Sequence, residues 1–159
     1  MQAAVLCLGK LREKHWRQAA EEYLKRLGRY GRVEEIELDD EPDPGEDSEA
    51  LALKVMDREA ARLLARLKPG DYVIALCVDG KQWDSVDFAK HLADLPQKGY
   101  QRTVFMIGGS LGLGEAALQR ADEKLSLSKM TFPHQLARVL LLEQIYRAAK
   151  ISAGERYHK

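Results

Sequence analysis

Short apolar runs alternate with longer amphipathic segments along this chain, and that alternation limits the possible folds more than any other feature. Strands are expected at 3–9, 33–38, 72–78, 102–108 and 124–128, and helices at 13–27, 48–67, 84–95, 115–122 and 133–154. Strands that alternate with helices in this way are typical of a mostly parallel sheet with helices on both faces. The sequence therefore predicts an α/β fold of five or six strands joined by crossover helices.

The size and composition fit one soluble domain over residues 1–159, because 159 residues with 45% hydrophobic side chains can bury a substantial core. The N-terminal apolar run is too short for a secretion signal and no run approaches a membrane span, so we expect a cytoplasmic protein without a membrane partner. Cys7 and Cys77 each lie in a strand-like run, far from any zinc-site spacing. They are expected to be buried reduced thiols, and no metal is expected.

Charge is unevenly distributed, although the formal net charge is zero. Residues 10–32 carry eight basic and three acidic side chains, residues 34–49 carry ten acidic ones, and residues 129–159 carry six basic and two acidic ones. The zero net charge argues against a general polyanion binder, since nonspecific nucleic-acid affinity depends on phosphate neutralisation by Lys and Arg. The acidic, proline-rich stretch 39–47 is expected to be a mobile surface loop.

Two turns rich in glycine or serine lie within residues 103–134, and each follows an apolar run. The first turn reads GGSLGLG and the second reads SLSKMTFPH. Strand ends of this kind leave backbone N–H and C=O groups accessible, so a flat or anionic ligand can approach the main chain closely. Two such turns close together would form a cofactor site.

Other glycine and serine motifs in the chain fit known nucleotide or hydrolase sites less well. Gly112, Gly114 and Ala117 match the GxGxxA pattern of a dinucleotide-binding turn, but too little chain follows to complete that unit. Ser110 lies in GGSLG, which lacks the GxSxG spacing of a hydrolase nucleophile. The sequence contains no GxxxxGK[ST] phosphate loop, which excludes that class of nucleotide site. A nicotinamide-dependent enzyme stays open as an alternative.

The predicted last helix is apolar around most of its circumference. At about 100° per residue, its polar side chains share one arc: Glu143, Gln144, Arg147 and Lys150. Leu136, Leu140 and Ile151 fall within the same arc, so the helix is either central to the core or shared with a second subunit; we favour a homodimer. Arg138 points into the apolar arc and needs a partner, so an intrachain salt bridge and a role in the site both stay open.

Three segments, in this order, resemble the RlmH family: IGGSLGLG at 107–114, LSLSKMTFPHQLARVLLLEQIYRA at 125–148 and YHK at 157–159. The similarity extends to VLCLGKLREKHW and LCVDGKQWDS in the first half of the chain. RlmH enzymes are SPOUT-class ribosomal large-subunit pseudouridine N3-methyltransferases. The resemblance implies a SPOUT-type domain whose C-terminal segment threads through a loop to form a trefoil knot, a topology that periodicity could not indicate.

The same resemblance implies the cofactor and the partners. The cofactor would be S-adenosyl-L-methionine, and the substrate would be N3 of a pseudouridine, of the position 1915 type, in helix 69 of 23S rRNA on assembled ribosomes. The enzyme would be a homodimer in which one subunit holds the cofactor and the other contributes basic surface. We hypothesise, apart from the resemblance, that this basic surface includes Lys10, Arg12, Lys14 and Arg17.

The resemblance also implies which residues bind the cofactor: Leu76, Gly108, Gly109, Leu127, Ser128, Lys129, Met130, Thr131 and Phe132. An apolar slot of Leu76, Leu127, Met130 and Phe132 would suit the flat adenine ring, while backbone groups contact its edge. The two glycines are expected to keep side chains out of the path of the ligand.

By the same resemblance, Arg147, Tyr157 and His158 are the expected catalytic residues, with no firm assignment of the general base. An imidazole can accept a proton near neutral pH, and a tyrosine can hydrogen-bond to or stack on a base. Lys159 stands where some relatives carry arginine, which alters the geometry of a phosphate contact. His134 is expected to be structural, hydrogen-bonded within the first helical turn. A non-catalytic ribosome-binding dimer stays open as a further alternative.

Overall fold

The computed structural model describes residues 1–45 and 48–159. Within that part, the strands are β1 (Gln2–Leu8), β2 (Arg32–Leu38), β3 (Asp71–Lys81), β4 (Arg102–Ile107) and β5 (Glu123–Leu125). The α-helices are α1 (Lys14–Leu27), α2 (Glu49–Leu64), α3 (Ser85–Asp94), α4 (Glu115–Arg120) and α5 (His134–Ser152), and a short 3-10 helix covers Pro96–Lys98. The predicted mobile loop at 39–47 includes residues 46 and 47, which lie outside the described residues.

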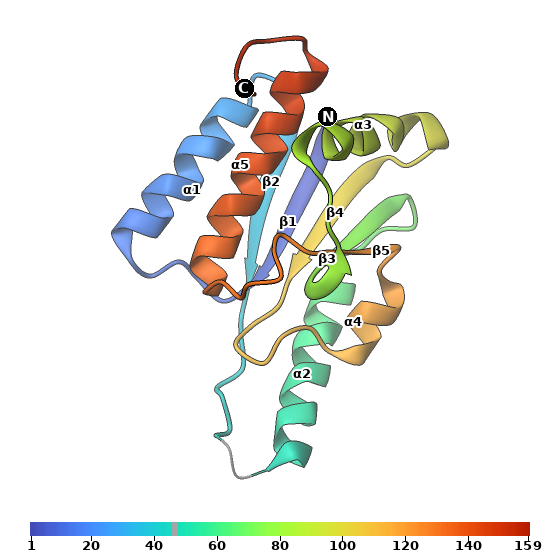
Figure 1. Ribbon diagram of the computed structural model, residues 1–159. Coiled ribbons are helices and arrows are strands. Elements are labelled where there is room, and N and C mark those ends of the chain that lie inside the picture. Colours follow the sequence, from blue (N-terminus) through green and yellow to red (C-terminus); the bar gives the residue numbers. More distant parts are fainter. Residues whose placement is uncertain (46–47) are drawn as a thin grey trace.

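The five strands form one parallel sheet in the order β2-β1-β4-β3-β5. Helices α1, α3 and α5 cover one face of this sheet, and α2 and α4 cover the other (Figure 1). The predicted α/β class, with a parallel sheet between two helical layers, is therefore confirmed. The trefoil knot stays a prediction.

Side chains of β1 alternate between the two helical layers, as the pleat of a strand requires. Val5 and Cys7 pack in the cluster beneath α1, α3 and α5, whereas Leu6 and Leu8 pack in the cluster beneath α2 and α4. Val5 and Leu6 are both 0% exposed. A strand buried on both faces explains the uninterrupted apolar run in the sequence.

Helix starts agree with the sequence, and one helix end does not. Asp84 Oδ1 accepts a hydrogen bond from the backbone N–H of Asp87 at 2.8 Å and so caps the start of α3, at the predicted position. Helix α2 was expected to continue to residue 67, but it ends at Leu64. The next residues form tighter turns, in which Leu67 donates to the carbonyl of Leu64 at 3.1 Å.

Arg138 is buried and paired within its own chain. Its Nε donates to Glu35 at 2.7 Å and its Nη2 donates to Glu37 at 2.6 Å, both on β2. Burial alone would lower the pKa of Arg138, but the hydrogen bonds and charges of these carboxylates raise it instead. Of the two possibilities left open by the sequence, the intrachain salt bridge is the one observed.

Helix α5 leaves several apolar side chains partly exposed, among them Leu136, Val139, Leu140 and Ile151. Its opposite side is buried against the sheet through Leu141, Leu142 and Ile145. A single copy of the chain therefore uses only part of the apolar surface of α5. The homodimer stays a prediction that this surface favours.

The two cysteines differ in burial. Cys7 is 1% exposed, and burial raises the pKa of its thiol, so it stays protonated at neutral pH. Cys77 is only half-buried, so the expectation of full burial was right for one thiol of the two. Among residues 1–45 and 48–159, no helix is long and apolar enough to cross a membrane.

Candidate functional site

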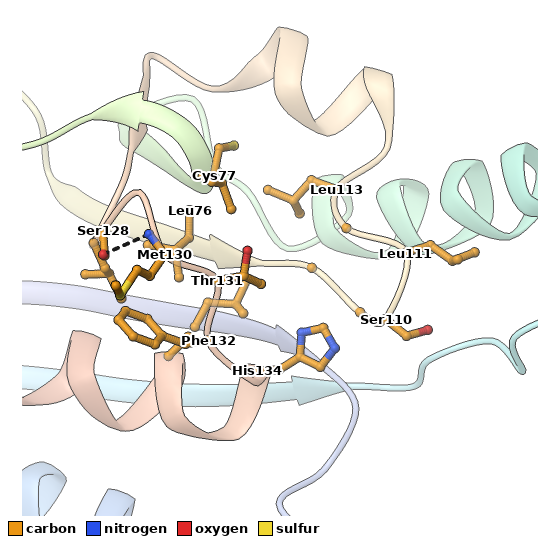
Figure 2. Close-up of a pocket in the computed structure, with 17 residues that line it drawn as sticks. Leu76, Cys77, Ser110, Leu111, Leu113, Ser128, Met130, Thr131, Phe132 and His134 are labelled. Carbon is orange, nitrogen blue, oxygen red and sulfur yellow. Dashed lines mark hydrogen bonds between the residues drawn. The ribbon is translucent and has the colours of Figure 1, made fainter.

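A cavity of about 320 Å³ opens beside β3 and the carboxyl end of β4. Three segments surround it: the middle of β3, the glycine-rich turn after β4, and the serine-rich segment that leads into α5 (Figure 2). Its lining residues are Leu76, Cys77, Val78, Ile107, Gly108, Gly109, Ser110, Leu111, Gly112, Leu113, Leu127, Ser128, Met130, Thr131, Phe132, His134 and Ala137. The two turns singled out in the sequence thus face one common cavity.

Eight of the nine residues expected at a cofactor site line this cavity: Leu76, Gly108, Gly109, Leu127, Ser128, Met130, Thr131 and Phe132. Lys129 does not line it, and its side chain is exposed. Met130 is 76% exposed, which is unusual for a large apolar side chain and places it at the mouth of the cavity. The cavity therefore has an apolar wall and one apolar side chain open to solvent.

The glycine turn closes on itself, and this accounts for Gly108. A Cβ at Gly108 would lie 2.6 Å from the backbone carbon of Gly112 and 2.8 Å from the backbone nitrogen of Leu113. Gly112 has a φ of 85°, and its N–H donates to the carbonyl of Gly109 at 3.0 Å. Gly108 is thus required by the backbone of the turn itself, in addition to the access for a ligand that the sequence suggested.

Glu59 of α2 lies beneath this turn. It is 3% exposed, and a Cβ at Gly109 would lie 3.1 Å from its Oε2. The same oxygen accepts a hydrogen bond from the backbone N–H of Glu41 at 3.0 Å. Burial, together with the charge of Asp40, raises the pKa of Glu59. Glu59 therefore bonds to the loop after β2 and leaves little room for a side chain at Gly109, an arrangement that the sequence did not reveal.

Two serines shape the second turn. Ser126 Oγ donates to the carbonyl of Ser128 at 2.9 Å. Ser128 Oγ accepts from the backbone N–H of Met130 at 3.0 Å, the bond drawn in Figure 2. Short side-chain to backbone bonds of this kind stabilise turns in place of a regular ladder. They hold the segment that carries Thr131 and Phe132 against the cavity.

Sequence reasoning missed several lining residues. Leu111 and Leu113 belong to the glycine turn, so their position beside Gly108 in the sequence could have indicated them. Cys77 and Ala137 reach the cavity only through the tertiary fold. His134, the first residue of α5, also lines the cavity. The hydrogen bond expected for its imidazole is not found among residues 1–45 and 48–159. The same residues contain no cluster of three or more His, Cys, Asp or Glu side chains arranged to hold a metal ion.

The GxGxxA pattern has a packing explanation. A Cβ at Gly114 would lie 2.6 Å from the carbonyl oxygen of Met56 on α2, and Ala117 is 0% exposed. The small residues at these positions allow α4 to lie close to α2. The pattern therefore does not need a dinucleotide to account for it.

The three expected catalytic residues lie together at the far end of α5. His158 Nδ1 is 3.2 Å from Arg147 Nη1, and the Arg147 guanidinium lies over the Tyr157 ring, 4.7 Å from its centroid. Glu143 joins this cluster, which the sequence analysis did not include. Its Oε1 accepts from Arg147 Nη2 at 2.6 Å and from the Tyr157 hydroxyl at 3.1 Å. The spacing of four residues between Glu143 and Arg147 on one helix was the available signal.

The protonation of this tail cluster follows from the same contacts. Burial, together with the hydrogen bond to Glu143, raises the pKa of Tyr157, so its hydroxyl is neutral and donates at neutral pH. The hydrogen bond to Glu143 likewise raises the pKa of Arg147, which stays cationic. The cluster offers a hydroxyl, a cation and an imidazole within one small volume.

Glu155 anchors the tail to the body of the protein. Its Oε2 accepts from Lys150 Nζ at 2.6 Å and from the Tyr30 hydroxyl at 2.8 Å. The Tyr157 ring also packs edge-on against Tyr146, with centroids 4.9 Å apart. The last residues are therefore held to the body of the protein by specific contacts.

The cavity and the tail cluster lie at opposite ends of α5 (Figure 1). His134 lines the cavity, and Arg147 follows it by thirteen residues, which at 1.5 Å per residue corresponds to about 20 Å along the helix. None of Arg147, Tyr157 and His158 lines the cavity. One chain therefore does not bring its own tail to its own cavity in this structure.

The sequence matches, over residues 1–158, the family described as "Predicted SPOUT methyltransferase". The chain belongs to the SPOUT methyltransferase family. It is 50% identical to the ribosomal RNA large subunit methyltransferase H of Clostridium novyi and 48% identical to that of Exiguobacterium sp., over 159 residues and 100% of both chains in each case. The resemblance to the RlmH family is thereby confirmed, and this SPOUT methyltransferase belongs to that branch.

A solved structure supports the SPOUT fold alone. It is described as "Structural insights into the 2-OH methylation of C/U34 on tRNA", with a TM-score of 0.51, 17% identity and coverage of 98% of each chain. Together with the packing role of Gly114, membership of a methyltransferase family decides against the nicotinamide-dependent alternative.

Proposed function

We propose that this SPOUT methyltransferase transfers a methyl group from S-adenosyl-L-methionine to N3 of a pseudouridine in helix 69 of 23S rRNA on assembled ribosomes. The observation that carries the proposal is the cavity between the glycine and serine turns, in a chain whose relatives at 48–50% identity are large-subunit rRNA methyltransferases. The ribosomal substrate would place the protein in the cytoplasm.

The lining of the cavity suits the proposed cofactor. Leu76, Leu127 and Phe132 offer apolar surface for a flat adenine ring, and the backbone groups of the two turns offer hydrogen-bond partners for its edge. When bound, the cofactor supplies a methyl group on a sulfonium; N3 gains that methyl and loses its proton, and S-adenosylhomocysteine leaves. Ser126 and Ser128 would hold the pocket in the shape that the ligand needs.

The tail cluster would act on the target base. The Tyr157 hydroxyl proton is held by Glu143, so this residue would stack its ring on the base or accept a hydrogen bond through its oxygen. Arg147 is paired with Glu143 through Nε and Nη2, and its Nη1 would donate to negative charge that develops on the base as the N3 proton departs. His158 lies beside Arg147 in the tail cluster and is the candidate that receives the N3 proton, directly or through water. Lys159 would add a point charge near the phosphate.

A homodimer would join the two halves of this site. Because cavity and tail lie about 20 Å apart along α5, the tail that completes a given cavity would come from a second copy of the chain. The partly exposed Leu136, Leu140 and Ile151 supply apolar surface for that contact. The trefoil knot of the family would enclose the cofactor by routing the chain at 126–133 through the loop around it.

Ribosomes that lack the modification provide the decisive test, with labelled methyl transfer measured on assembled ribosomes and on free 23S rRNA. We expect transfer to the ribosomes and much less to free rRNA. S-adenosylmethionine should raise the melting temperature of the protein and NAD should not, since only a ligand of the native state stabilises it. Deletion of residues 157–159 should abolish transfer and leave cofactor binding intact. A wild-type protein that binds ribosomes without transferring a methyl group would favour the scaffold alternative.

A further inference from the structure

A second hollow, of about 200 Å³, adjoins the cofactor cavity on the other side of the glycine turn. It lies between the loop after β1 and the first turn of α5, and it is far more polar than the cavity. Its lining residues are Cys7, Leu8, Gly9, Lys10, Leu11, Arg12, Glu13, Asp40, Ile107, Gly108, Gly109, Ser110, His134, Gln135 and Arg138. Ile107 to Ser110 and His134 line both hollows, so the wall between them consists of one short turn and one imidazole.

The polar hollow carries cationic groups available to a ligand. Lys10 and Arg12 are exposed, and no ion pair is found for either within the described chain. The third cation, Arg138, is already neutralised by Glu35 and Glu37. A ligand that reaches this hollow therefore meets two positive charges on the loop after β1.

Carboxylates line the same hollow, which narrows the class of ligand. Glu13 and Asp40 can accept hydrogen bonds, so a simple polyanion would meet repulsion here. A nucleotide in RNA carries both an anionic phosphate and base N–H donors, and it matches a lining of two cations and two acceptors. The mixture of charges thus favours a nucleotide over an inorganic anion.

The loop that bears Lys10 and Arg12 is held in place by buried contacts. The backbone N–H of Leu11 donates to Glu37 Oε2 at 2.9 Å, and that carboxylate is fixed by Arg138. Arg138 Nη1 also donates to the carbonyl of Gly9 at 3.4 Å. Because the loop is anchored on both sides, less ordering entropy is lost when a ligand binds.

We propose that the polar hollow holds the acceptor nucleotide, with its phosphate at Lys10 and Arg12 and its base against Ser110 and His134. This inference rests on the proposed function and refines one part of it. The basic loop would serve the cofactor cavity of its own chain, and not that of the opposite subunit as the sequence suggested. Each active site would then combine the cavity and the polar hollow of one chain with the tail of the other.

The test compares two double variants that each remove one lysine and one arginine. The first variant alters the polar hollow and combines Lys10→Gln with Arg12→Gln. The second is the control and combines Arg58→Gln with Lys98→Gln. Both control residues are exposed and lie outside the cavity and the polar hollow. Ribosome binding across a salt series, S-adenosylhomocysteine binding and methyl transfer are measured for each.

The hollow variant should bind ribosomes about tenfold more weakly or worse, with a salt slope reduced by about one for each lost phosphate contact. Its affinity for S-adenosylhomocysteine should stay within about twofold of wild type, and the control should match wild type throughout. Ribosome binding equal to the control would overturn the proposal, and so would a parallel loss of cofactor binding. A wild-type protein that transfers no methyl group would refute the proposed function, while ribosome binding would still test the hollow.

Discussion

Asp71 is a buried carboxylate whose charge is balanced by Arg102. Arg102 donates to it through Nε at 2.9 Å and Nη2 at 2.6 Å, and the backbone N–H of Lys68 donates at 2.7 Å. Burial alone would raise the pKa of Asp71, but these hydrogen bonds outweigh it and hold the pKa below its ordinary value. The pair fixes the start of β3, the strand that leads to Leu76.

Asp71→Asn should lower the free energy of unfolding by about 3 kcal/mol at pH 7, because it leaves the charge of Arg102 uncompensated. Since the pKa of Asp71 is lower in the folded state, its contribution is present above the unfolded pKa of about 4 and is lost as the pH falls through the folded value. Urea unfolding at pH 7 and pH 3 measures the free energy of unfolding of both proteins. The difference in this free energy between wild type and variant should be smaller at pH 3 than at pH 7.

The exposed pair of Glu22 and Arg26 supplies the matched control. Its Arg26 Nε donates to Glu22 Oε1 at 2.9 Å, as Arg102 Nε does to Asp71, but both side chains are about half exposed to solvent. Glu22→Gln should change the free energy of unfolding by less than about 1 kcal/mol. Equal effects of the two substitutions would show that burial does not govern the Asp71 pair.

Long-range side-chain partners were the least predictable feature of individual residues. The need of Arg138 for a partner followed from its position on an apolar arc, yet Glu35 and Glu37 lie 103 and 101 residues away along the sequence. Their i, i+2 spacing places both on one face of a strand, but only the fold shows that this face meets α5. The sequence placed Glu143 on the polar arc of the last helix. Its hydrogen bond with Tyr157 depends on the path of the tail, which the sequence does not indicate.

Turning to whole elements, the segment between β5 and α5 should lose its shape if its serine bonds are removed. Ser128→Ala deletes the acceptor for the backbone N–H of Met130, a bond worth about 1 kcal/mol. We expect the affinity for S-adenosylmethionine to fall about fivefold, since the lost energy appears as poorer ordering of the pocket. Calorimetric titration measures this.

Ser152→Ala, at the exposed end of α5, is the control for that substitution. It should bind the cofactor as wild type does. If both variants bind equally well, the serine bonds shape the free protein without contributing to the pocket.

Strands, helices and the two turns were predictable because their signals are local. An apolar run that ends at Gly108, or a helix that begins after Asp84, is determined by a few neighbouring residues. Sheet order and cavity lining are not local properties. Lys129 was expected among the cofactor-binding residues because its sequence neighbours on both sides are. The serine turn directs its side chain to solvent, away from the cavity.

For the molecule as a whole, periodicity indicated an α/β fold and the length of its last helix, but not which end of that helix meets the cofactor cavity. Sequence motifs placed the glycine turn and the tail in one site, and the structure places them at opposite ends of α5. Under the proposed function, a second copy of the chain would reconcile the predicted single site with this separation.

Because the cavity and the tail lie at opposite ends of α5, two inactive variants with different defects should restore methyl transfer when they form a mixed dimer. A chain lacking residues 157–159 keeps its cavity, and a Gly108→Ala chain, whose turn cannot close, keeps its tail. Random pairing of the two makes half of the dimers mixed, each with one complete site, so about one quarter of wild-type activity should return on co-expression. Either variant mixed with itself should stay inactive. Failure to complement, with mixed dimers present, would mean that each chain builds its site alone.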